Sequence, residues 1–84
     1  MRQIEITFHQ NIKHEQQKAV LEKINSWNSI EAAGHLMPDS DDRNIQRMAF
    51  AYIRDDAKIK AVSKQLEEIP EIETALVPPM REIQ

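Results

Sequence analysis

Apolar residues first recur every two residues and then every three or four residues, and this change of period occurs twice along the chain. Ile4, Ile6 and Phe8 alternate with polar residues, which is the period of a strand with one dry face. An apolar stripe at helical spacing follows. The second half repeats this change of period after residue 48. Two strand–helix units in 84 residues favour a single sheet covered by two helices.

In the first half, we expect Asn11 to cap a helix that ends among Asn25, Asn28 and Ser29. Its buried stripe is predicted to comprise Val20, Leu21, Ile24 and Trp27. A second strand is expected over residues 30–37, where one face could be shared by Ile30, Ala32, Gly34 and Leu36. Gly34 is the only glycine and suggests either a bulge or a close approach of backbone.

The second half begins with a polar turn over residues 38–42. We predict a third strand from Met48 to Ile53, and then a helix capped by Asp55 or Asp56. The apolar stripe of that helix is Ile59, Val62, Leu66 and Ile69, and Pro70 ends it because its ring disfavours helical geometry in the preceding residue. Ile72, Thr74 and Leu76 form a fourth strand.

This β-α-β-β-α-β order predicts an α+β, ferredoxin-like fold, in which two helices cover one face of a four-stranded antiparallel sheet. Right-handed crossovers place the first and third strands at the centre. We expect one domain over residues 1–79 and a C-terminal tail over residues 80–84.

Composition excludes several classes of function. The chain has no cysteine, which removes disulfides, thiolate metal sites and cysteine catalysis. The net charge of −3 gives no overall attraction for nucleic acid, and no apolar run is long enough to span a membrane. The first residues do not form a signal peptide, so we expect a cytoplasmic protein.

The polar residues predict no catalytic, metal or cofactor site. His9 and His14 have no recognised metal-ligand spacing, and Asp39, Asp41 and Asp42 lack the glycine and distal glutamate of a calcium loop. No serine has a histidine at a spacing that indicates a nucleophile. We therefore expect a protein that is not an enzyme and binds no cofactor.

The third strand carries the candidate binding residues. Small Ala49 and Ala51 fit under the helices, which points Met48, Phe50 and Tyr52 onto the uncovered face of the sheet. The opposite register would bury Phe50 and leave the two alanines outside. Three large side chains on an uncovered face are typical of a partner or ligand surface, or of self-association through the sheet.

Met48 to Ile53 also resembles the aromatic central strand of RNA-recognition-motif domains, where such rings stack on bases. The basic residue and glycine that open that motif are missing here, and Glu5 and Thr7 occupy the outward positions of the first strand. Binding to single-stranded RNA is therefore the third of three alternatives.

A longer resemblance covers nearly the whole chain. Phe50-Ala51, the helix ending at Leu66 to Pro70, and Ile72 opening the last strand are similar to the subtilisin propeptide family. That family includes free-standing inhibitors of subtilisin-type serine proteases with the same β-α-β-β-α-β order. After the last strand, where the family often has an acidic cluster, this chain has Leu76-Val77-Pro78.

The resemblance implies that the open sheet face docks on a protease and that the tail enters the substrate cleft as an extended strand. The implied contact residues are Met48, Phe50, Tyr52, Met80, Arg81, Glu82, Ile83 and Gln84. The alternative is a regulatory module that forms a homodimer through its sheet and binds a small molecule at the interface.

Overall fold

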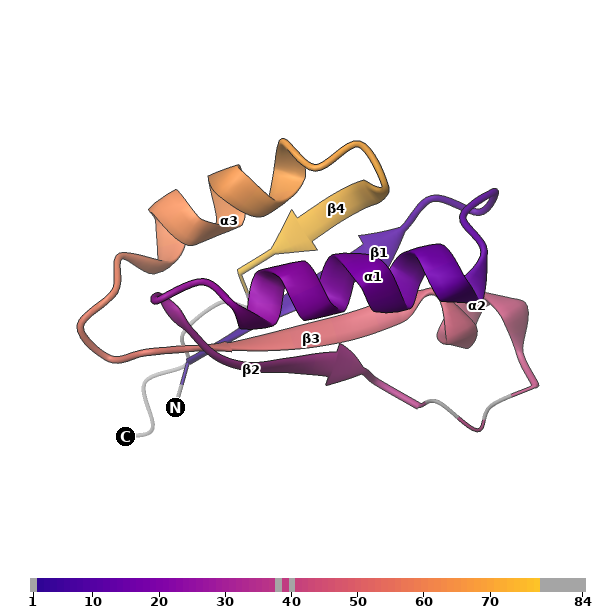
Figure 1. Ribbon diagram of the computed structural model, residues 1–84, viewed down its shortest axis with the longest axis horizontal. Helices are drawn as coiled ribbons and strands as arrows, with labels where there is room; N and C mark the ends of the chain where they lie inside the picture. The colour runs from indigo at the N-terminus through magenta and orange to yellow at the C-terminus, as the bar shows by residue number, and fades with distance from the viewer. Residues whose placement is uncertain (1, 38, 40, 78–84) are drawn as a thin grey trace, which may run out of the picture.

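A computed structural model describes residues 2–37, 39 and 41–77 of the chain, and Figure 1 shows the arrangement of its elements. The first half contains β1 (Arg2–Phe8), α1 (His14–Asn25) and β2 (Ile30–His35). A short helix, α2 (Arg43–Gln46), leads into the second half, which contains β3 (Met48–Ile53), α3 (Ile59–Glu67) and β4 (Ile72–Leu76). The predicted α+β class and element order are confirmed, with α2 as an addition.

The four strands form one antiparallel sheet in the order β2-β3-β1-β4, so β1 and β3 are central as predicted. Alternate residues of β1 point to the helical face, where Ile4, Ile6 and Phe8 are almost completely buried. They join the buried stripes of α1 and α3 in one hydrophobic cluster. The opposite face of the sheet has no covering layer among the described residues (Figure 1).

Each long helix packs over the edge strand that follows it, α1 over β2 and α3 over β4 (Figure 1). A polar side chain fixes each pair. The Asn25 amide donates to the Ala33 carbonyl at 3.0 Å and accepts from the Ala33 N–H at 2.9 Å. The buried Ser63 hydroxyl donates to the Ala75 carbonyl at 2.7 Å. These bonds satisfy backbone groups of edge strands, which would otherwise be open to pairing with another chain.

The predicted caps are wrong at both long helices. Helix α1 begins after Lys13 rather than Asn11, and its first turn is closed by the Gln16 side chain, which accepts from the Lys13 N–H at 2.9 Å. Helix α3 begins after Lys58, which makes no side-chain cap, rather than after Asp55 or Asp56. A propensity to cap places a residue near a helix end, but the chain path between sheet and helix chooses the position.

The shared face predicted for β2 is also wrong at its first residue. Ile30 lies opposite Ile53 and is buried against the helices, whereas Ala32 lies opposite Tyr52 on the open face. The register shifts between these two residues, and an irregularity of this kind moves neighbouring side chains to opposite faces. A bulge was one of two features predicted at Gly34. The irregularity in β2 lies instead between Ile30 and Ala32, at the start of the strand.

Candidate binding surface and a neighbouring cavity

The third strand has the orientation predicted for it. Ala49, Ala51 and Ile53 are buried under the helices, while Met48, Phe50 and Tyr52 are half-buried on the opposite face. The rings of Phe50 and Tyr52 contact each other in a tilted arrangement, with centroids 4.8 Å apart. The two aromatic rings therefore form one cluster at the centre of the open sheet face.

Strand pairing places a row of four residues across this face. Gly34 lies opposite Phe50, Phe50 lies opposite Glu5, and Glu5 lies opposite Leu76. The Leu76 side chain is 56 % exposed, and Val77, just beyond β4, is also exposed. The surface thus has an aromatic centre, a carboxylate beside it, and an exposed aliphatic residue where β4 ends.

Gly34 lies next to the ring of Phe50. A Cβ atom built at Gly34 would lie 3.5 Å from two ring carbons of Phe50, so the ring covers the glycine in ordinary van der Waals contact. The sequence suggested a close approach of backbone at this glycine, whereas the neighbour in the structure is an aromatic side chain. An aromatic ring over a strand glycine shields backbone that a side chain would normally cover.

The remaining predicted contact residues cannot be placed in the same way. Met80, Arg81, Glu82, Ile83 and Gln84 lie outside the described residues. Of the predicted set, the structure brings together Met48, Phe50 and Tyr52, and adds Leu76 as a fourth apolar residue on the same face.

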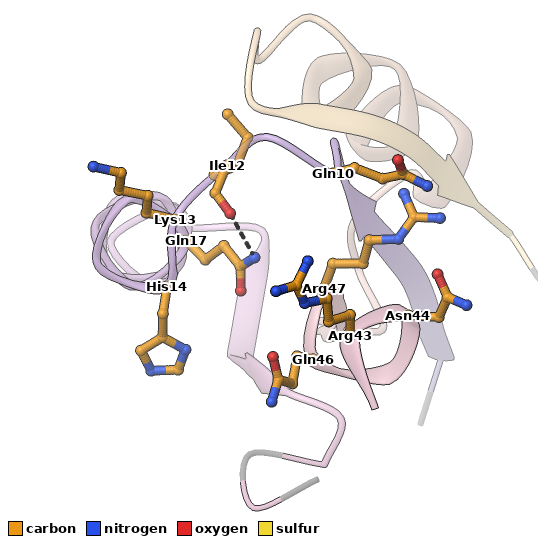
Figure 2. Close-up of a pocket in the computed structure, with 9 residues that line it drawn as sticks. All are labelled: Gln10, Ile12, Lys13, His14, Gln17, Arg43, Asn44, Gln46 and Arg47. Carbon is orange, nitrogen blue, oxygen red and sulfur yellow. Dashed lines mark hydrogen bonds between the residues drawn. The ribbon is translucent and has the colours of Figure 1, made fainter. Parts of the chain in front are cut away.

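The sequence reasoning missed a cavity of about 620 Å³ between the start of α1 and the α2 segment, shown in Figure 2. It is lined by Gln10, Ile12, Lys13, His14, Gln17, Arg43, Asn44, Gln46 and Arg47. Three of these side chains are permanent cations, and none of the described lining residues is acidic. Arg43 and Arg47 lie between α1 and the strands, whereas Lys13 extends away from them (Figure 2).

Arg47 is held in place by the sheet. Its Nη1 donates to the Phe8 carbonyl at 3.2 Å and to the Glu73 carboxylate at 3.3 Å. Its Nε is buried and has no hydrogen-bond partner within the described part of the chain. Burying such a donor without a partner is unfavourable.

The wall of the cavity on α1 is fixed by Gln17, which is 5 % exposed. Its Nε2 donates to the Ile12 carbonyl at 3.2 Å, drawn in Figure 2, so its Oε1 is the acceptor for His35 Nε2 at 2.9 Å. The His35 ring stacks on that of His14, with centroids 4.7 Å apart. Burial lowers the pKa of His35, and the neighbouring His14 and Lys18 lower it further.

The described residues contain no group of three His, Asp or Glu side chains placed to hold a metal ion. None of their helices is long and apolar enough to cross a membrane.

Comparison with protein-family models, with curated protein sequences and with solved structures gave no match.

Proposed function

We propose that this chain is a non-enzymatic binding domain that inhibits a subtilisin-type serine protease, or assists its folding, through the open sheet face. The observation that carries the proposal is the outward Phe50–Tyr52 cluster on the uncovered central strand. Aromatic residues at the centre of an interface commonly supply most of its binding energy. A domain with one apolar sheet face can bury that face by docking on a partner.

The position of β4 supports a contribution from the tail. Leu76 ends β4 on the same face as Phe50, with Glu5 of β1 between them. Residues 80–84 follow this strand end in the sequence. In the proposed complex the sheet face contacts the protease surface, and residues 80–84 occupy its cleft in extended form.

The test is inhibition of a purified subtilisin-type protease by the full chain and by Phe50→Asp. Placing a charge at the centre of the contact is expected to weaken inhibition at least about thirtyfold, which corresponds to the loss of one interface hot spot. Ile59→Asp is the matched control, because Ile59 is also a half-buried apolar residue but packs in the helical layer. Its inhibition should match that of the unmodified chain once both are shown to be folded.

Deletion of residues 80–84 should weaken inhibition while leaving the melting temperature unchanged. A folded full chain that fails to inhibit at micromolar concentration would count against the whole proposal. Equal losses in Phe50→Asp and Ile59→Asp would show that fold stability, and not the open face, is responsible.

The second candidate is a homodimer formed by two open sheet faces. It is favoured by the central position of the Phe50–Tyr52 cluster, which a two-fold contact would place against its own copy. Sedimentation equilibrium distinguishes the two functions: a concentration-dependent mass that becomes monomeric in Phe50→Asp indicates self-association.

A further inference from the structure

We propose that the cavity between α1 and α2 binds a small dianion that carries a phosphate group or two carboxylates. The cavity lies at the end of the sheet where β1 leads into α1, and the proposed protease contact does not use it. The proposal is therefore independent of the function proposed above.

The local charge of the cavity favours an anion. The whole chain is acidic, with a net charge of −3, yet Lys13, Arg43 and Arg47 all line this cavity. The carboxylate paired with one of them is Glu73, which lies on β4 outside the lining and contacts Nη1 of Arg47. The two guanidiniums, with the flexible Lys13 at the rim, outnumber this one carboxylate and would attract an anion.

The cavity is also lined by cations that have no carboxylate partner. Arg43 and the Lys13 ammonium form no ion pair within the described part of the chain. A guanidinium presents N–H donors in a planar fork that matches phosphate or carboxylate oxygens. Both arginines line this cavity, and each can bind oxygens of an anion there.

Much of the site is already formed. The Phe8 carbonyl and Glu73 hold Arg47, while Ile12 and His35 hold the buried Gln17. Little side-chain entropy remains to be lost at these two positions when a ligand binds. The volume of about 620 Å³ lies within the range typical of small-molecule sites, so it would accept an organic molecule bearing the anionic group.

The experiment is an NMR titration of the full chain with inorganic phosphate and, separately, with malonate, each against chloride at equal ionic strength. We expect saturable amide shifts confined to residues 10–17 and 43–47, with a Kd below about 1 mM for at least one of the two anions. Tighter binding of phosphate would assign the ligand to phosphorylated compounds, and tighter binding of malonate to dicarboxylates.

Arg43→Gln tests the site directly, because Arg43 is exposed and its loss should leave the fold intact. We expect affinity to fall at least about tenfold, as for the loss of a charged hydrogen bond. Lys60→Gln is the matched control, because it also removes one positive charge. Lys60 lies at the start of α3, which follows the C-terminal end of β3, whereas the cavity lies near the N-terminal end of β3. The affinity of this variant should stay within about twofold of the unmodified chain.

Three results would overturn the proposal. They are shifts that do not saturate with either anion, equal weakening in Arg43→Gln and Lys60→Gln, and saturable shifts that map outside residues 10–17 and 43–47. The third readout needs only the unmodified chain, so the proposal can be rejected even if Arg43→Gln fails to fold.

Discussion

At the scale of single residues, Gly34 and Phe50 are cross-strand neighbours on the open face. The glycine has no positive φ, so its backbone conformation is one that any residue adopts. A Cβ there would meet the Phe50 ring at 3.5 Å, which is an ordinary contact and not a clash. The glycine is therefore tolerated by the strand rather than required by it.

Gly34→Ala should accordingly raise the free energy of unfolding by about 0.5–1 kcal/mol, because alanine loses less backbone freedom on folding. Urea denaturation measures this change. Ala32→Gly is the reverse control on the same strand and face, opposite Tyr52, and should lower stability by a similar amount. A loss of stability in Gly34→Ala would show that the ring cannot accommodate the added methyl group.

Titration of His35 is expected to change the stability of the fold. Its pKa in the folded chain is lowered by burial first, and then by His14 and Lys18. In the unfolded chain it takes up a proton near the ordinary value of about 6.5. Below that pH the unfolded state binds more protons than the folded state, so stability falls as the pH falls from about 6.5 toward the lowered pKa.

His35→Gln should flatten this part of the stability profile, measured by urea denaturation at several pH values between about 5 and 7.5. His9→Gln is the control, because His9 is a histidine outside the stacked pair, near Glu73. If His9→Gln flattened the profile as much as His35→Gln, the assignment to the stacked pair would be wrong.

At the scale of elements, each helix is attached to an edge strand by a side chain that the hydrophobic pattern does not reveal. The Asn25 amide exchanges two hydrogen bonds with Ala33 of β2 and also donates to the Leu21 carbonyl at 3.0 Å. From the sequence, Asn25 is expected only to help mark the end of the helix. Its role depends on β2 lying next to the end of α1, and no local spacing reports that.

Asn25→Ala should lower the free energy of unfolding by about 1–2 kcal/mol, because it leaves the Ala33 backbone groups without their partner. It should also increase aggregation, since part of the β2 edge becomes available for pairing. Asn28→Ala is the matched control, because Asn28 is exposed and makes no hydrogen bond within the described part of the chain. Chemical denaturation and light scattering measure the two effects.

At the scale of the whole molecule, the two similar halves share one hydrophobic cluster. Residues from β1, α1, β3, α3 and β4 all contribute to it, and Trp27 packs against its margin. A small domain with a single core usually unfolds in one cooperative transition. Neither half should therefore retain its structure after the other has unfolded.

Leu66→Ala tests this cooperativity from α3, where Leu66 is completely buried. The truncation should cost about 2–5 kcal/mol. Trp27 lies just after α1, so its fluorescence reports from the other half of the chain and should give the same shifted midpoint as far-UV circular dichroism. Lys64→Ala, an exposed neighbour, should change stability by less than about 0.5 kcal/mol. Separate midpoints for the two probes would contradict the single core.

The sequence by itself determined the order of the strands and long helices, the bounds of β3 and the outward direction of Phe50 and Tyr52. These features follow from apolar periodicity, which is a local property of strands and helices packed on one core. Only the tertiary structure decided the helix caps, the register shift in β2, and the cavity that brings His14 and Gln17 near Arg43 and Arg47. Those features depend on contacts between segments that are distant in the chain, and the spacing of residues within one segment does not predict such contacts.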